Sequence, residues 1–205
     1  MIGIVDYGMG NLGSVANALD YLGHAPRLLA RAEEIPEASH LILPGVGSYA
    51  AAMANLARAH LVAAIRDHIA EGKPFLGICL GMQLLSTTGA EHGPTAGLDV
   101  IPGEVVPLEA RPELKIPHVG WNNVDLKRKH PVFAGIKTHI DFYFVHSFHF
   151  RAADAADVLG TTPYGEDFAS CVARGSVVGV QFHPEKSQES GLKLLDNFCD
   201  WDGRC

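Results

Sequence analysis

The chain contains the stretch Phe75-Leu76-Gly77-Ile78-Cys79-Leu80-Gly81-Met82-Gln83, from which both a fold class and a chemistry can be predicted. An apolar run typical of a buried strand enters a Gly-x-Cys-x-Gly turn, and an amphipathic helical pattern follows it. A residue at such a strand-to-helix elbow is strained and exposed, and glycines two positions away on either side let the neighbouring backbone pass without a clash. Free N–H groups at the start of a helix favour a thiolate. The pattern therefore predicts a nucleophilic Cys79 rather than a buried core cysteine.

A nucleophilic thiol needs a base, and the stretch Val178-Gly179-Val180-Gln181-Phe182-His183-Pro184-Glu185 supplies one. His183 follows an apolar strand pattern, and Pro184 cannot continue that strand. Glu185 lies two positions further on, where its carboxylate can reach the imidazole ring. We therefore predict a catalytic set in which Cys79 attacks, His183 transfers protons and Glu185 orients the imidazole.

These two stretches together resemble the class I, or triad, glutamine amidotransferase domain, and the resemblance covers essentially the whole chain. Further segments resemble one family within that class, the glutaminase subunit of imidazole glycerol phosphate synthase of histidine biosynthesis: Asp6-Tyr7-Gly8-Met9-Gly10-Asn11-Leu12-Gly13-Ser14-Val15, Leu43-Pro44-Gly45-Val46-Gly47, Pro117-His118-Val119-Gly120-Trp121-Asn122 and Tyr143-Phe144-Val145-His146-Ser147. The resemblance implies hydrolysis of glutamine to glutamate and ammonia through a cysteinyl thioester. It implies no cofactor.

The resemblance also implies how the substrate is held. One oxyanion donor would be the backbone N–H of Leu80, and the other would come from Gly45-Val46-Gly47, where two glycines permit a peptide to rotate. Ordinary turn formation is the alternative for that segment. Gln83, one helical turn from Cys79, and the Ser147-Phe148 segment would hold the glutamine. Relatives commonly have tyrosine at position 148, whereas this chain has phenylalanine.

A partner is implied as well. A cyclase subunit with a (β/α)₈ barrel would dock over the site as a heterodimer, and ammonia would pass to it for formation of imidazole glycerol phosphate and AICAR. The positions that match this interface are Asn11, Trp121, Tyr143 and Lys186. Trp121 and Tyr143 could instead be core aromatics, and Lys186 could be a solvated residue at a helix start.

Short apolar runs alternate with helical patterns in the first half of the chain, which predicts a three-layer α/β/α domain with a mostly parallel central sheet. We expect strands at 2–5, 27–29, 41–43 and 75–78, and helices at 11–22, 49–59, 61–71 and 80–86. From residue 104 the pattern becomes β-rich, through 142–145, 158–161 and 169–180, before a closing helix at 187–198. The β-rich part would add antiparallel strands and bring His183 beside Cys79, because sites in such sheets lie at carboxyl ends of strands.

Composition narrows the function classes. The 205 residues, 47% of them hydrophobic, suit one domain spanning residues 1–205. The formal net charge of −7 disfavours a nucleic-acid partner. No stretch approaches the roughly 18 apolar residues of a membrane helix.

Neither the histidines nor the cysteines have metal-ligand spacing, so we predict no metal ion. The cysteines also lack a disulfide pattern, which favours a cytoplasmic protein. These residues include His118, His139, His146 and His149, with Cys79, Cys171, Cys199 and Cys205.

Other functions compete with this prediction. The segment Gly8-Met9-Gly10-Asn11-Leu12-Gly13 fits the G-x-G-x-x-G pattern of an NAD-binding dehydrogenase, and Glu33 or Glu34 would have to hold the ribose. A dehydrogenase leaves the Cys79, His183 and Glu185 elements without a role. A binding scaffold without activity is a second alternative. The third is the amidotransferase subunit of another synthase, such as those that make anthranilate, guanylate or carbamoyl phosphate.

Overall fold

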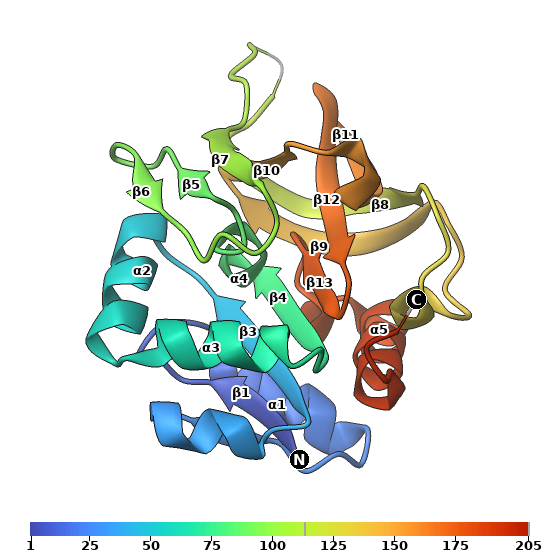
Figure 1. The fold of residues 1–205 in the computed structure, drawn as a ribbon. Coiled ribbons are helices and arrows are strands. Elements are labelled where there is room, and N and C mark those ends of the chain that lie inside the picture. Colours follow the sequence, from blue (N-terminus) through green and yellow to red (C-terminus); the bar gives the residue numbers. More distant parts are fainter. Residues whose placement is uncertain (113, 205) are drawn as a thin grey trace.

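The computed structural model describes residues 1–112 and 114–204 (Figure 1). Strands and helices alternate in the first half of the chain, and the predicted strands there are confirmed. The elements are β1 (Ile2–Val5), α1 (Leu12–Tyr21), β2 (Arg27–Leu29), the 3₁₀ helix η1 (Ala32–Glu37), β3 (His40–Gly45), α2 (Tyr49–Arg58), α3 (Leu61–Ala70), β4 (Phe75–Cys79) and α4 (Leu80–Gln83).

The second half is dominated by strands, as the alternating pattern predicts. The segment at 169–180 forms parts of two strands rather than one, because a turn interrupts it. The elements are β5 (Thr88–Gly89), β6 (Thr95–Ala96), β7 (Gly103–Pro107), β8 (His118–Leu126), η2 (Pro131–Phe133), β9 (Ile140–His146), β10 (Phe148–Ala152), η3 (Ala155–Asp157), β11 (Val158–Tyr164), β12 (Glu166–Arg174), β13 (Val177–Val180), η4 (Pro184–Lys186) and α5 (Gln188–Asp200).

The strands form a mixed sheet in the order β2-β1-β3-β4-β13-β12-β10-β7-β5-β6. The first five strands of this order are parallel to one another. Antiparallel pairing begins where β12 joins β13, and β11, β8 and β9 extend from β12 as a branch. The predicted combination of a parallel part and an added antiparallel part is confirmed.

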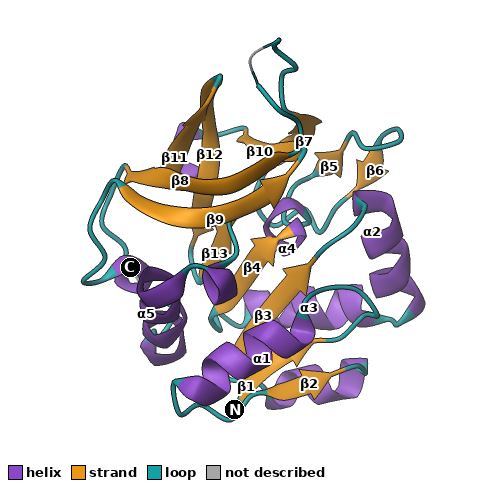
Figure 2. Ribbon diagram, turned by 180° about the vertical axis from the view of Figure 1, so that it is seen from behind, coloured by secondary structure: helices purple, strands orange, loops and turns teal. Residues whose placement is uncertain are grey.

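Helices cover both faces of the parallel strands. Helices α2 and α3 lie on the face nearest the viewer in Figure 1, and α1 and α5 lie on the opposite face, which Figure 2 brings to the front. Strand residues alternate between the two layers, as a pleated strand requires. Ile42 and Leu76 belong to the core shared with α1 and α5, whereas Leu41 and Phe75 belong to the core shared with α2 and α3. This is the expected three-layer arrangement.

Helix α4 is shorter than the predicted helix at 80–86, which is therefore wrong at its C-terminal end. The carbonyl groups of Leu84, Leu85 and Ser86 accept hydrogen bonds from backbone N–H groups of residues 98–101, with N···O distances of 2.8–3.0 Å. A carbonyl that points to a distant loop cannot also extend the helix by a regular i to i+4 ladder. The helix therefore ends at Gln83, one turn after the elbow.

The antiparallel part lies beyond the carboxyl ends of the parallel strands, where the long strands β8 and β9 curve past the end of β13 (Figure 2). Across residues 1–112 and 114–204, the helices are too short or too polar to cross a membrane. The sheet therefore leaves its carboxyl-terminal edge, with the antiparallel strands around it, as the place for a site.

Candidate active site

Three neighbouring parallel strands end at the same place. Gly45, the last residue of β3, pairs with Cys79, the last residue of β4. On the other side of β4, Val180 at the end of β13 pairs with Ile78, and His183 follows three residues later. The parallel register alone therefore brings together the segment 45–47, Cys79 and His183, which are far apart in the sequence.

The elbow at Cys79 has the strained backbone that the sequence predicts, but Cys79 is 6% exposed and therefore buried, so the expected exposure of this residue is wrong. Its dihedral angles are φ 54° and ψ −109°, in a region that a residue with a side chain rarely adopts. A Cβ atom on Gly81 would lie 1.7 Å from the carbonyl oxygen of Leu43, and one on Gly77 would lie 2.6 Å from the carbonyl oxygen of Gly81. Both glycines are thus required by the close approach of the backbone, as expected.

His183 and Glu185 form a buried pair beside this elbow. The Nδ1 atom of His183 lies 2.8 Å from Oε1 of Glu185, and the side chains are 2% and 1% exposed. Burial alone would lower the pKa of His183, but the nearby Cys79 and the hydrogen bond and charge of Glu185 outweigh burial and raise it to about 9. Among the described residues, the Nε2 atom of His183 has no hydrogen-bond partner. It remains available to a reacting group.

The backbone of His183 is fixed to strand β9. Its N–H donates to the carbonyl of Tyr143 at 2.9 Å. The hydroxyl of Ser187 donates to the carbonyl of His183 at 2.7 Å and accepts the N–H of Tyr143 at 3.0 Å. Both backbone groups of His183, its N–H directly and its carbonyl through Ser187, are therefore linked to Tyr143 of β9, which fixes the position of the imidazole.

A cavity of about 300 Å³ opens beside the thiol. It is lined by Cys79 and by most of the residues that the sequence predicts for the oxyanion hole and the substrate: Val46, Gly47, Leu80, Gln83, Ser147 and Phe148. Gly45 lies behind this lining, where a Cβ atom would come within 2.9 Å of Cβ of Leu80. The structure thus gathers the predicted groups around one cavity of a size that suits a small amino acid.

The side chain of Gln83 is oriented by two hydrogen bonds. Its Nε2 donates to the carbonyl of Phe148 at 2.9 Å and to Oε1 of Gln181 at 3.0 Å. Because both N–H groups are used inside the protein, the group of Gln83 that remains for a ligand in the cavity is its oxygen.

Comparison with known proteins agrees with this geometry. The model of a family described as glutamine amidotransferase class-I matches residues 3–201. The imidazole glycerol phosphate synthase subunit HisH of Moorella thermoacetica is 52% identical over 197 residues, which cover 96% of this chain and 93% of that protein. The HisH subunit of Aquifex aeolicus is 47% identical over 196 residues, which cover 95% and 94%.

The chain belongs to the class-I glutamine amidotransferases, in their HisH group. Solved structures share the fold of this glutamine amidotransferase at much lower identity. PurLQS from Thermotoga maritima aligns with a TM-score of 0.76 at 20% identity, over 97% of each chain. A glutamine amidotransferase from the same organism aligns with a TM-score of 0.64 at 18% identity, over 97% of this chain and 82% of that one.

Sequence reasoning about this amidotransferase missed Tyr7 and Glu91. The hydroxyl of Tyr7 donates to the carbonyl of Pro44 at 3.1 Å, and it fills the space where Gly45 lacks a side chain. Burial, followed by the negative charge of Cys79, raises the pKa of Tyr7. Glu91 lines the cavity, and its Oε2 accepts the N–H of Tyr49 at 2.7 Å. Tyr7 lies in the segment 6–15 that resembles the family, and this was the signal that could have found it. Glu91 lies in no such segment.

The predicted interface residues lie near the site. Trp121 is 48% exposed, so the alternative of a core aromatic is wrong for it. Its ring meets that of Tyr143 edge to face at 6.1 Å between centroids, and Nζ of Lys186 lies 6.0 Å from the Tyr143 ring. Nδ2 of Asn11 donates to Oε1 of Glu185 at 3.5 Å. All four residues thus lie on or beside the elements that carry the His183–Glu185 pair.

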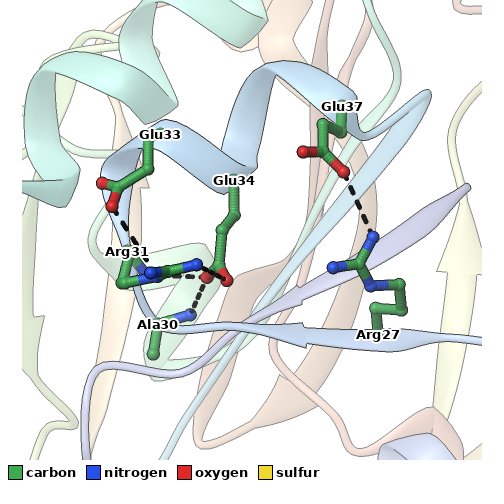
Figure 3. A network of polar contacts seen from close by, with 6 residues as sticks. All are labelled: Arg27, Ala30, Arg31, Glu33, Glu34 and Glu37. Carbon is green, nitrogen blue, oxygen red and sulfur yellow. Dashed lines mark hydrogen bonds and ion pairs between the residues drawn. The ribbon is translucent and has the colours of Figure 1, made fainter.

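The two acidic residues that the dinucleotide alternative requires both contact Arg31. The carboxylate of Glu34 accepts the backbone N–H groups of Ala30 and Arg31, each at 3.1 Å, and the Arg31 guanidinium at 2.8 Å (Figure 3). Glu33 pairs with the same guanidinium at 3.7 Å. Glu34 therefore caps the start of η1 and does not present a free carboxylate to a ribose.

Proposed function

We propose that this chain is the glutaminase subunit of an imidazole glycerol phosphate synthase: it hydrolyses glutamine to glutamate and ammonia and passes the ammonia to a cyclase subunit. The observation that supports the proposal is that the parallel strands β3, β4 and β13 end side by side: Cys79 ends β4, His183 follows β13, and a cavity beside the thiol is lined by Val46 and Gly47. The names of the relatives at 44–52% identity support the choice of synthase.

The reaction would proceed in two steps. The Cys79 thiolate attacks the side-chain amide carbon of glutamine and forms a C–S bond, and the carbonyl oxygen becomes an oxyanion. When this intermediate collapses, the C–N bond breaks and Nε2 of His183 gives its proton to the leaving nitrogen, which departs as ammonia. His183 then takes a proton from water, the hydroxide attacks the thioester, and the C–S bond breaks to release glutamate. Glu185 holds the imidazole and stabilises its charged form throughout.

The cavity supplies groups for each part of the substrate. The N–H of Leu80 and a donor from Gly45-Val46-Gly47 would stabilise the oxyanion. The free oxygen of Gln83 and main-chain groups of Ser147-Phe148 would hold the amino-acid end. Glu91 is the acidic residue among the lining, so its carboxylate suits the α-ammonium group of the substrate.

Ammonia would be lost as ammonium if the site opened to water. We propose that the cyclase subunit, as a heterodimer partner, covers the rim formed by Asn11, Trp121, Tyr143 and Lys186. A large exposed aromatic at such a rim is typical of a buried anchor in an interface. Residues 1–205 would act as one domain, in the cytoplasm; the three described cysteines are free thiols, which supports a reducing compartment. The fourth cysteine, Cys205, lies outside the described residues.

Ammonia transfer tests the proposal. The chain is mixed separately with the cyclase subunit of histidine biosynthesis and with the synthase subunits for anthranilate and guanylate, each with its own acceptor substrate and with glutamine as the nitrogen source. We expect glutamine-dependent product only with the cyclase subunit. Product with another synthase subunit instead would contradict the choice of partner, and glutamate formation in no mixture would contradict the chemistry.

A further inference from the structure

Gln181 is a fully buried polar residue that the two-step reaction above does not use. It directly follows β13 and lies opposite the elbow. Its Nε2 atom lies 3.7 Å from Sγ of Cys79, within the range of an N–H···S hydrogen bond. Its Oε1 accepts the hydrogen bond from Gln83 described above, at 3.0 Å. Both ends of the amide are therefore engaged, one with the nucleophile and the other with the cavity wall.

The hydrogen-bond network determines which end of the Gln181 amide faces the sulfur. The carbonyl oxygen of Phe148 is an acceptor only, so the Gln83 atom that contacts it is the nitrogen. The same carbonyl also accepts Nδ1 of His146 at 2.8 Å, which fills its second lone pair. Since the nitrogen of Gln83 also contacts Gln181, the facing atom of Gln181 is its oxygen. The nitrogen of Gln181 is left to point at Cys79.

We propose that the Gln181 amide donates a hydrogen bond to the Cys79 thiolate and is a catalytic residue of this site. The proposal rests on the function proposed above, in which Cys79 is the nucleophile. Among the described residues, the sulfur also forms a hydrogen bond of 3.9 Å with the carbonyl of Val145. A carbonyl can only accept, so this contact favours the thiol, whereas the Gln181 N–H favours the thiolate. The amide would act twice, on the attacking thiolate and on the sulfur that leaves the thioester.

The titratable groups around Cys79 come from several elements. Tyr7 follows β1, and His183, with Glu185 on its far nitrogen, follows β13. His146 at the end of β9 and Glu91 between β5 and β6 line the same cavity. These groups remain unchanged when Gln181 is replaced. A change in the titration of Cys79 in such a variant therefore reports on the amide itself.

The test is the pH dependence of Cys79 alkylation by iodoacetamide, measured on the isolated chain by mass spectrometry of the peptide that contains Cys79. Gln181→Met keeps the approximate length of the side chain but removes the donor. We expect the pH at half-maximal alkylation rate to rise by about one unit, since a hydrogen bond to a charged group typically has an effect of that order. Val178→Ala removes buried volume from the same strand without contacting the sulfur, and its midpoint should equal that of the wild type.

An unchanged midpoint in Gln181→Met would overturn the proposal. A measurement on the wild-type protein covers the case in which the methionine variant does not fold. In the wild-type protein, the side-chain amide ¹⁵N signal of Gln181 must shift with the same midpoint as alkylation. Glutaminase assays with the cyclase subunit separate this proposal from the proposed function: if the wild type lacks activity, the function fails, while the alkylation result still decides the hydrogen bond.

Discussion

The Nδ1 atom of His183 lies 2.8 Å from Oε1 of Glu185, in a pair that is almost inaccessible to water. A carboxylate can only accept, so this contact fixes a proton on Nδ1 and leaves Nε2 to face the reacting groups. The arrangement holds the imidazole by its backbone through Tyr143 and Ser187 and by its ring through Glu185. We therefore expect the loss of activity on removal of the imidazole ring to differ from the loss on replacement of Glu185.

Glu185→Gln should reduce the turnover of glutamine less than His183→Ala does. We expect the kcat values of the two variants to differ by roughly one to two orders of magnitude. A glutamine side chain can still accept from Nδ1 through its oxygen, but no neighbouring group replaces the proton transfer of the imidazole. Steady-state kcat for both variants, in the presence of the cyclase subunit, measures the difference. Equal losses in the two variants would contradict the separate roles.

Gly81→Ala should prevent stable folding, with a loss of more than about 4 kcal/mol, because the new methyl group would overlap the carbonyl oxygen of Leu43 at 1.7 Å. Gly13→Ala is the matched control. Gly13 lies in α1 with no atom within 4 Å of the position of a Cβ, so the substitution should stabilise the protein by about 0.5–1 kcal/mol. Urea unfolding monitored by circular dichroism compares them. A folded and stable Gly81→Ala protein would contradict the close approach described at the elbow.

Trp121→Ala should uncouple hydrolysis from transfer: glutamate is still produced, but a smaller share of the ammonia appears in the cyclised product. The reason is that a large exposed aromatic beside the site would exclude water once covered by the partner. The ratio of product to glutamate at saturating cyclase subunit is the readout. Leu28→Ala on the outer strand β2 removes another exposed apolar side chain, 50% exposed, and should leave the ratio unchanged. Loss of coupling in both variants, or in neither, would contradict a specific role for Trp121.

The protein should lose stability as the pH falls below about 6.5. Burial lowers the pKa of His118 to about 4 and that of His146 to about 3, and burial with the charge of Arg128 lowers that of His130 to about 4. Because these folded-state values lie below the unfolded value of about 6.5, the unfolded chain binds more protons, and stability is present above that pH and lost below it. The loss approaches about 1.4 kcal/mol per pH unit for each histidine.

Urea unfolding between pH 7 and pH 4 measures the slope of the free energy of unfolding against pH. His130 lies away from the cavity, where its Nδ1 accepts the N–H of Val132 at 3.2 Å. His130→Gln removes one of the three histidines and keeps an acceptor, so the slope should fall by up to about 1.4 kcal/mol per pH unit. An unchanged slope in this variant would contradict the neutral, buried state of His130.

The elbow could be predicted from sequence because its determinants are local. Gly77 and Gly81 flank Cys79 within one turn of chain, so the motif can be recognised locally; a Cβ atom on Gly77 would meet Gly81 itself, although the atom that excludes a side chain at Gly81 is the carbonyl oxygen of Leu43 on β3. The positions of the parallel strands followed from their apolar runs for the same reason. The meeting of Cys79 and His183 followed from a general rule on strand ends, which the register of β4 and β13 satisfies.

Features that depend on distant contacts could not be predicted. Helix α4 ends early because the carbonyl groups of the residues that follow it accept hydrogen bonds from a loop more than ten residues away. The contact between Gln181 and Cys79 spans 102 positions in sequence, and nothing in the motif around Gln181 specifies which way its amide points. Glu91 reaches the cavity from a loop with no recognisable pattern. In each case the decisive partner is chosen by tertiary packing rather than by neighbours in the chain.

The most direct test of the account is glutamine hydrolysis by Cys79→Ala in the presence of the cyclase subunit, because every step proposed here passes through the thioester on that sulfur. The elbow depends on its two glycines, so the variant should fold and bind its partner as the wild type does, which circular dichroism and analytical gel filtration check. The account predicts no glutamate above the uncatalysed background. Retention of glutamate formation by the folded, partner-bound variant would contradict the assignment of Cys79 as the nucleophile.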